Sequence, residues 1–454
     1  APAPLVLETR RAQFTDDGGH RIEFPADTVS RLEHHISPIT GIVASLRPLG
    51  EVGARTATFV AEHTFVDIHL DPYALHEGLR KRSGGKGARA DQARAGAIGE
   101  ALERYSGVFE GDEPRLWATR TELGEAAIHP NAYMGYSEQQ YRTREVWNAR
   151  GSRVHWVPEP FDDASAIEWT PLWSLMAAEP RYLPTSCCYY GYPGAGARFA
   201  AANSNGCAAG NTLEEAILQG FLELVERDGV AIWWYNRLCR PAVDLASFED
   251  PYVDRLLEHY RAMGREIWVL DVTGDLGIPT CAAVSRREGT REQDIVLGFG
   301  AHLDARIALL RALTEVSQSL PAVPGRGAAP RYAGSNPEAA RWWRTATLEE
   351  QPHLRPNTGL AARRRSDYPV LTSGDLRDDV LRCAQIVAGH GMETLVLDQT
   401  RPDVGLHVVR VVVPGLRHFW ARFGPGRLYD VPVQMGWREA PLDEAELNPW
   451  VVYF

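Results

Sequence analysis

Apolar residues recur with a helical period over residues 213–224. The stripe consists of Leu213, Ala216, Ile217, Gly220, Phe221 and Leu224. Spacing of i, i+3, i+4 and i+7 is typical of a helix with one buried face. Thr212 and Glu215 match a capping box at the start of this helix, in which the side chain of each residue accepts a hydrogen bond from the backbone amide of the other. The pattern therefore predicts a helix that begins after Thr212.

Short apolar runs alternate with helical patterns along the rest of the chain. Further helices are predicted around Gly99–Arg104 and over about residues 303–320 and 375–390. Strands are predicted over Ile267–Val272, Cys281–Val284, Ile295–Phe299, 393–398 and 406–413. Strands that alternate with helices indicate a mixed α/β fold.

The segments between these elements also carry expectations. Glycine-rich loops are expected at Ser83–Gly87 and Ser204–Gly210, each shortly before a helix. Residues 321–368 are rich in proline and arginine and are expected to form a mobile lid or a partner surface. The final 20 residues are expected to be extended.

Charge and cysteine usage exclude several classes of function. The chain of 454 residues has a net charge of −11, whereas a general nucleic-acid binder needs a basic surface. No apolar run reaches the roughly 18–20 residues that span a bilayer. The six cysteines lack C-x-x-C or zinc-ligand spacing, which favours free thiols. We expect a cytoplasmic protein without a nucleic-acid or membrane partner.

Two helical segments carry the same acidic motif, E-x-x-E-R. It occurs at Glu100, Glu103 and Arg104, and again 123 residues later from Glu223. Glutamates three apart lie on one helical face. A single acidic face is most often a solvated surface, but its repetition after two glycine-rich loops favours a functional site. This is the nearest approach to an internal repeat in the chain.

The same parts favour binding of a nucleoside triphosphate. Glycine-rich turns before helix N-termini present backbone amides that suit phosphate. Four carboxylates can hold Mg²⁺, with phosphate oxygens completing its coordination. Lys86, Arg104, Arg227 and Arg311 can neutralise phosphate charge, although Arg311 alone also fits a surface arginine. The loop is not a Walker A motif, because Gly87 follows the lysine.

These segments resemble the YcaO family, and within it the D-type cyclodehydratases that install thiazolines and oxazolines in ribosomal peptides. SGGKG, EALERYSG and SNGCAAGNTLEEAILQGFLELVERD are similar to the family's ATP-site motifs. DQTRPDVGLHVVRVVVPG, HFWARFGPGRLYDVP and MGW resemble the azoline-forming branch. The resemblance covers about residues 60–440. It implies the YcaO fold, an α/β architecture of mixed sheets with helices surrounding a central ATP/Mg site.

The resemblance also implies roles for individual residues. Asn211 and Glu215 match the pair that holds the nucleoside, and Gln219 is added by geometry, one turn from Glu215 and from Glu223. The Mg²⁺ ligands it implies are Glu100, Glu103, Glu223 and Glu226. The expected ATP-binding residues are Ser83, Lys86, Arg104, Asn211, Glu215, Gln219, Arg227 and Arg311.

The implied activity is an ATP-dependent cyclodehydration of a ribosomal precursor peptide. A Cys, Ser or Thr side chain adds to the preceding amide carbonyl, whose oxygen is phosphorylated and departs with phosphate. The implied organisation is an N-terminal segment or small subdomain at 1–60, a catalytic domain at 61–440 and a C-terminal tail at 441–454. A homodimer is expected, together with a separate leader-binding partner, either E1-like or ocin-ThiF-like.

Some readings stay open from sequence. Azoline-forming relatives often end in a proline-rich tail, whereas this chain ends NPWVVYF; the carboxylate of Phe454 either reaches the active site or belongs to a docked terminal strand. Thioamide and macrolactamidine formation would use the same ATP site. A non-catalytic ATP-binding scaffold is the alternative from another class of function.

Overall fold

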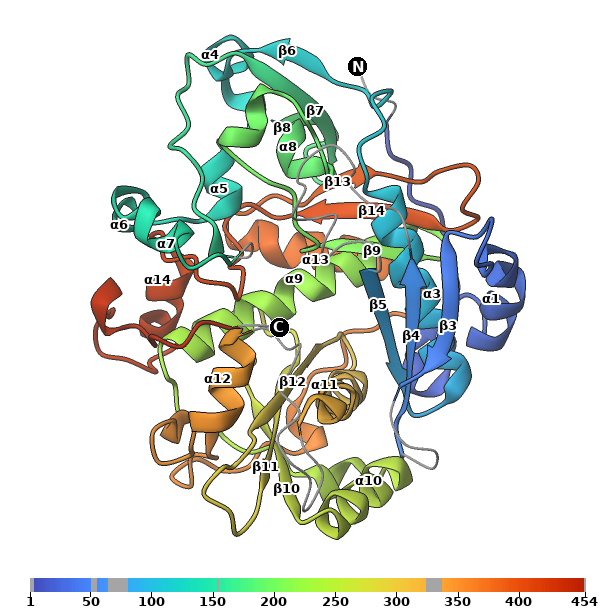
Figure 1. The fold of residues 1–454 in the computed structure, drawn as a ribbon, viewed down its shortest axis with the longest axis vertical. Coiled ribbons are helices and arrows are strands. Elements are labelled where there is room, and N and C mark those ends of the chain that lie inside the picture. Colours follow the sequence, from blue (N-terminus) through green and yellow to red (C-terminus); the bar gives the residue numbers. More distant parts are fainter. Residues whose placement is uncertain (1–3, 50–54, 64–80, 153–154, 324–336, 453–454) are drawn as a thin grey trace.

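The computed structural model describes residues 4–49, 55–63, 81–152, 155–323 and 337–452, and within them the strands form four sheets (Figure 1). The largest sheet has six strands in the order β6-β7-β13-β14-β9, with β8 paired to β7. Its strands are β6 (Leu116–Ala118), β7 (Ile167–Ser174), β8 (Pro180–Pro184), β9 (Cys207–Gly210), β13 (Leu395–Asp398) and β14 (His407–Val412). β14 is buried along nearly its whole length, as the apolar run at 406–413 predicts.

The remaining strands form two three-stranded sheets and a short hairpin. One sheet joins β3 (Val43–Pro48), β4 (Ala57–His63) and β5 (Lys81–Gly87) in that order. The other joins β10 (Arg265–Asp271), β11 (Thr280–Arg287) and β12 (Val296–Ala301). The hairpin pairs β1 (Gln13–Phe14) with β2 (His20–Arg21). All pairings within these sheets are antiparallel.

One helix, α9 (Leu213–Tyr235), crosses the middle of the molecule between the large sheet and the β10–β12 sheet (Figure 1). Of its 23 residues 19 are buried, so its acidic side is not a solvated surface. The other helices of eight or more residues are α1 (Pro25–Leu32), α3 (Ala90–Ser106), α10 (Pro251–Ala262), α11 (Ala305–Ser319), α12 (Pro337–Thr345), α13 (Leu376–Gly389) and α14 (Arg427–Gln434). Shorter ones are α4 (Arg120–Leu123), α5 (Pro130–Met134), α6 (Glu138–Arg142), α7 (Arg144–Asn148) and α8 (Thr185–Cys188).

Three strands carry glycines that let a helix approach their backbone. A Cβ on Gly85 of β5 would lie 1.8 Å from the carbonyl oxygen of Ala93 in α3. A Cβ on Gly300 of β12 would lie 2.2 Å from a backbone oxygen of α11, and one on Gly210 of β9 would lie 2.5 Å from a backbone nitrogen of α9. The pairs β5/α3, β9/α9 and β12/α11 are therefore packed backbone against backbone.

The structure corrects the sequence expectations in two segments. The glycine-rich runs are not simply loops, since Lys81–Gly87 is strand β5 and Cys207–Gly210 is strand β9. The expected lid contains helix α12, whose Trp342 is fully buried; residues 324–336 lie outside the described residues. Antiparallel pairing with β4 explains the first difference, because it supplies hydrogen-bond partners that a short glycine-rich sequence does not reveal.

Other expectations are met or refined. The strands at 267–272, 281–284, 295–299 and 393–398 and the helices at 303–320 and 375–390 appear within a few residues of their expected bounds. All six cysteines are free. The boundary expected at residue 60 falls inside β4, which pairs with β3 and with β5. Within the described part of the chain, no helix combines the length and the apolar character needed to cross a membrane.

Replacement of Gly85 by alanine tests the close packing of β5 on α3. The added methyl group would collide with the α3 backbone, so we expect a loss of about 1–3 kcal/mol in the free energy of unfolding. Gly99→Ala is the control on the partner helix α3, where a Cβ meets nothing within 4 Å; there we expect a gain of about 0.5–1 kcal/mol. Urea unfolding measures both, and equal effects of the two substitutions would contradict the packing argument.

Candidate active site

A cavity of about 550 Å³ lies where α3, α9 and α11 meet. This volume lies within the roughly 300–1,000 Å³ of ligand sites. Eleven of the residues predicted from sequence line it: Lys86, Glu100, Glu103, Arg104, Asn211, Glu215, Gln219, Glu223, Glu226, Arg227 and Arg311. Segments up to 225 residues apart in sequence, from Lys86 to Arg311, therefore converge on one site.

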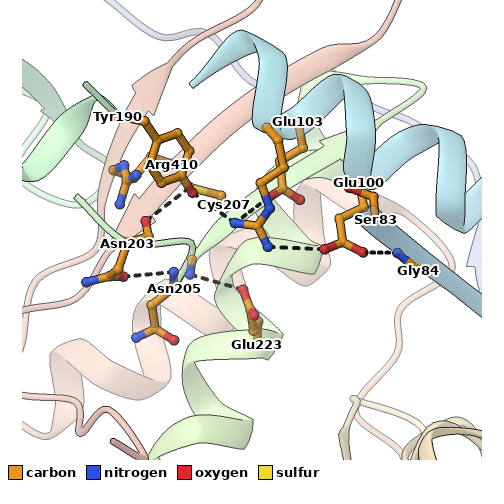
Figure 2. A network of polar contacts seen from close by, with 12 residues as sticks. Ser83, Gly84, Glu100, Glu103, Tyr190, Asn203, Asn205, Cys207, Glu223 and Arg410 are labelled. Carbon is orange, nitrogen blue, oxygen red and sulfur yellow. Dashed lines mark hydrogen bonds and ion pairs between the residues drawn. The ribbon is translucent and has the colours of Figure 1, made fainter. Parts of the chain in front are cut away.

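The first E-x-x-E-R motif is held in place by hydrogen bonds from both sides (Figure 2). One oxygen of Glu100 accepts from the Gly84 backbone amide at 2.9 Å, and the other accepts from the Arg104 guanidinium at 3.2 Å. Arg104 also lies 3.7 Å from Glu103. Glu100 thus links strand β5 to the arginine one helical turn further along α3.

The second motif repeats this arrangement. Glu223 accepts from the Gly206 backbone amide at 3.1 Å and from Arg227 at 3.0 Å. Arg227 also donates to Glu226 at 2.8 Å. In each motif the first glutamate joins a glycine amide before the helix to the arginine four residues later. The repeat seen in sequence is therefore a repeat of local structure.

Burial controls the charge state of the second glutamate in each motif. Desolvation raises the pKa of Glu103 to about 8, against the opposing effect of Arg104. Desolvation likewise raises the pKa of Glu226 to about 7, against Arg227. A cation in the cavity would favour the charged form of both carboxyls, and their oxygens are the ligands that Mg²⁺ prefers.

The donor set therefore fits magnesium held jointly with phosphate. Among the described residues, no group of three or more His, Cys, Asp or Glu side chains is arranged to hold a metal ion alone, and arginines lie between the carboxylates. Mg²⁺ commonly takes one or two protein carboxylates and completes its coordination with water and substrate phosphates. The fit is to a metal–nucleotide pair and not to a closed metal cage.

The N-terminal segment contributes residues that sequence analysis missed. Thr28 of α1 shares a hydrogen bond of 3.0 Å with Asn211, to which Arg31 also donates. Arg21 donates to Glu215 at 3.2 Å. Arg21 and Thr28 line the cavity. The Thr212 hydroxyl does cap α9, but the Glu215 side chain binds this segment instead of closing the capping box.

Helix α11 adds a basic and an acidic group to the cavity. Arg311 donates to Gln219 of α9, which supports including both in the site. Arg311 is partly buried and lines the cavity, and burial and nearby Arg21 lower its pKa to about 10. Glu315, which sequence analysis missed, forms an ion pair with Lys86. The sequence could have indicated Glu315, because it lies one helical turn after Arg311 and therefore on the same face of the helix.

One predicted site residue does not line the cavity, and another cannot be placed. Ser83 is 1% exposed, and its hydroxyl lies 3.1 Å from His63, on the opposite side of β5 from the cavity-lining Gly84. Successive residues of a strand face opposite sides, which explains the separation. Phe454, proposed to supply a carboxylate, lies outside the described residues.

Polar contacts around Tyr190 hold Arg104 of the first motif in place (Figure 2). The Tyr190 hydroxyl accepts from Arg104 at 2.9 Å and lies 3.9 Å from the Cys207 thiol. Arg410, fully buried, donates to the Tyr133 hydroxyl at 3.3 Å and lowers the pKa of Glu103 slightly through its charge. Tyr190 therefore fixes the orientation of Arg104 toward the two glutamates.

The family model described as YcaO cyclodehydratase, ATP- and Mg²⁺-binding, matches residues 84–417. The chain belongs to the YcaO family. A solved heterocyclase in complex with substrate and cofactor is 49% identical with a TM-score of 0.91, over 99% of this chain and 59% of that one. The heterocyclase TruD is 44% identical with a TM-score of 0.79, over 100% of this chain and 56% of that one. This chain therefore spans under two thirds of each heterocyclase.

The fold is also shared with a more distant family member. YcaO from Methanopyrus kandleri, bound with AMPPCP and Mg²⁺, is 21% identical with a TM-score of 0.63, over 88% of this chain and 93% of that one. The mixed α/β architecture predicted from sequence is thus the YcaO fold.

The raised pKa of Glu103 in this YcaO site predicts a pH dependence of stability. Between its ordinary pKa of 4.5 and about 8, the folded protein holds a proton that the unfolded chain has released. Stability of the protein without metal or nucleotide should therefore fall as pH rises through this range, by at most about 1.4 kcal/mol per pH unit for one proton. Glu103→Gln should flatten the dependence, as measured by urea unfolding at several pH values. Identical slopes for the two proteins would contradict the assignment.

Proposed function

We propose that this YcaO protein is an ATP-dependent cyclodehydratase that converts Cys, Ser or Thr residues of a ribosomal precursor peptide to azolines. The observation that carries the proposal is the pair of E-x-x-E-R helices facing one cavity in a chain that is 49% and 44% identical to two heterocyclases. The side chain forms a bond to the preceding carbonyl carbon. The carbonyl oxygen takes the γ-phosphoryl group and leaves as phosphate, so the products are the azoline, ADP and phosphate.

The acidic residues of the site would bind the metal, and the basic residues would neutralise phosphate charge. Magnesium, held by Glu100, Glu103, Glu223 and Glu226, would supply positive charge to the phosphates. Arg104 and Arg227 would neutralise the remaining phosphate charge from opposite helices, each fixed by its own glutamates. Most of the catalytic effect would come from positioning and electrostatic stabilisation.

Nucleotide orientation would rest on the other residues of the cavity. Asn211 and Glu215, fixed by the N-terminal segment, suit hydrogen bonds to a nucleoside. Lys86 and Arg311 are held by Glu315 and Gln219, and both would contact phosphate oxygens. We therefore place the nucleoside toward α1 and the phosphates toward α3 and α11.

Other YcaO reactions and a scaffold role remain the alternatives. Sulfide in place of the side chain would give a thioamide, and the peptide N-terminus would give a macrolactamidine. The identity to heterocyclases favours azoline formation, and the four glutamates disfavour a scaffold without catalysis. We further propose a cytoplasmic homodimer that receives its precursor peptide with the help of a separate leader-binding partner, E1-like or ocin-ThiF-like.

An isotope experiment tests the reaction directly. The full-length protein is given ATP, Mg²⁺ and a precursor peptide with a single Cys preceded by an ¹⁸O-labelled carbonyl. We expect the peptide to lose the mass of one ¹⁸O-labelled water molecule and the label to appear in inorganic phosphate. In a parallel reaction that also contains sulfide, exchange of oxygen for sulfur in the peptide would instead indicate a thioamide.

Glu226→Gln tests the proposed metal site in the same assay. Loss of a carboxylate that holds charge in the cavity should lower the rate of phosphate release by about 100-fold or more. Glu214→Gln is the matched control on the same helix, since Glu214 is buried outside the cavity and accepts from the Glu8 amide. Equal phosphate release by the wild type and Glu226→Gln would favour the scaffold.

The C-terminal tail permits a separate prediction. Its described part is docked on α9, because Trp234 donates to the Trp450 carbonyl and Val452 is fully buried. Deletion of the last five residues, 450–454, would therefore remove these core contacts together with the terminal carboxylate. Deletion of residues 453–454 alone should keep the melting temperature but lower kcat by about tenfold or more if the terminal carboxylate takes part. Unchanged turnover would reject that role.

A further inference from the structure

A second cavity of about 730 Å³ lies beside the nucleotide cavity and is not used by the proposed ATP site. Its walls come from α5, from the loop after β14 and from α14. The apolar part of its lining includes Met134, Tyr136, Met392, Leu416 and Val431. The volume is within the roughly 300–1,000 Å³ range of ligand sites. The cavity can therefore hold a ligand with both apolar and polar groups.

Two arginines of this cavity differ in their partners. Arg427 is fully engaged, because it donates to both Asp228 and Asp275 at 2.6–3.2 Å. Arg417 is 6% exposed, and within the described part of the chain it forms no ion pair, although it donates to the Pro425 carbonyl. Its Nε atom is buried and has no hydrogen-bond partner among the described residues. Since Arg417 lines the cavity and pairs with no carboxylate within the described part of the chain, its guanidinium can donate to an acceptor of a ligand.

The lining carries charges of both signs. Asp275 and Asp430 face the cavity beside Arg417, Arg422 and Arg427, so a phosphate or nucleotide would meet carboxylates as well as arginines. A neutral carbonyl oxygen satisfies an arginine donor without repulsion by the carboxylates. Together with the methionines and Tyr136, this combination suits an extended peptide backbone with small or apolar side chains.

The second cavity adjoins the nucleotide cavity at one side chain. His418 lines both cavities, and it also lines a small third cavity of about 70 Å³ between them. Its Nδ1 accepts from the Trp420 amide at 3.1 Å, and its ring stacks on Trp420 with centroids 3.9 Å apart. A group bound beside His418 in the second cavity is therefore one side chain away from the nucleotide.

We propose that the second cavity binds the segment of the precursor peptide that flanks the reacting residue, with Arg417 donating to a peptide carbonyl. This inference rests on the proposed function, because that reaction requires a peptide carbonyl to meet the γ-phosphate. The flanking segment lies along α5 and the loop after β14, and the reacting residue extends past His418 into the nucleotide cavity, where its carbonyl oxygen meets the γ-phosphate. The second cavity then holds only the flanking segment, and His418 lies where the peptide passes from one cavity to the other.

Photo-crosslinking tests the location. The probe is a precursor peptide that the full-length protein converts, with benzoylphenylalanine next to the reacting Cys; benzophenone inserts preferentially at methionine. Two of the chain's five methionines, Met134 and Met392, line the cavity. We expect crosslinks at these two. Crosslinks confined to Met176, which is exposed and lines neither cavity, would overturn the proposal.

A cavity-filling substitution provides an independent test. Ala132 is exposed at the edge of the cavity, so Ala132→Trp should occupy it without disturbing the core. We expect KM for the peptide to rise by about tenfold or more while KM for ATP is unchanged. Ala149→Trp, at an exposed alanine that lines neither cavity, is the matched control. Unchanged peptide KM in Ala132→Trp would overturn the cavity assignment, whereas a wild-type protein that converts no peptide would contradict the proposed function itself.

Discussion

The structure depends on a balance of charge in one poorly solvated cavity. Glu100, Glu103, Glu223 and Glu226 are brought together there, and carboxylates in such a place repel one another and lose solvation. Arg104 and Arg227 offset this, each within 4 Å of the two glutamates of its own helix. Because each arginine lies on the same helix as its partners, formation of the helix already sets most of the balance.

This balance requires the helices to be held at fixed positions relative to the strands beside them. Gly85 and Gly210 allow backbone contact between strand and helix, and the amides of Gly84 and Gly206 bind the first glutamate of each motif. In each of these strand–helix pairs, glycines therefore both allow close packing and supply the backbone amide that binds a glutamate. The pair β12/α11 packs in the same way, but in α11 the arginine precedes the glutamate. Arg311 binds Gln219 and Glu315 binds Lys86 across the cavity.

Sequence predicts what is local here and misses what depends on distant segments. The stripe of α9 and the apolar run of β14 follow from their own residues, and the spacing of the acidic motifs indicates which side chains share a face. The strand character of Lys81–Gly87 depends on pairing with β4, and the contacts of Thr28 and Arg21 depend on how the N-terminal segment folds onto α9. The burial of Ser83 beside His63 has a related cause, because a strand fixes which face each residue points to and a loop does not.

The net charge of −11 is compatible with a polyanionic substrate because the acidic and basic groups are separated by role. Two of the glutamates that would hold magnesium, Glu103 and Glu226, are poorly solvated, and desolvation raises the pKa of each toward or above neutral pH. Binding of a divalent cation would release protons from them and convert an unfavourable site into a favourable one. Stability of the fold is therefore not maximal in the empty protein, and the largely apolar burial of α9 offsets this local disadvantage.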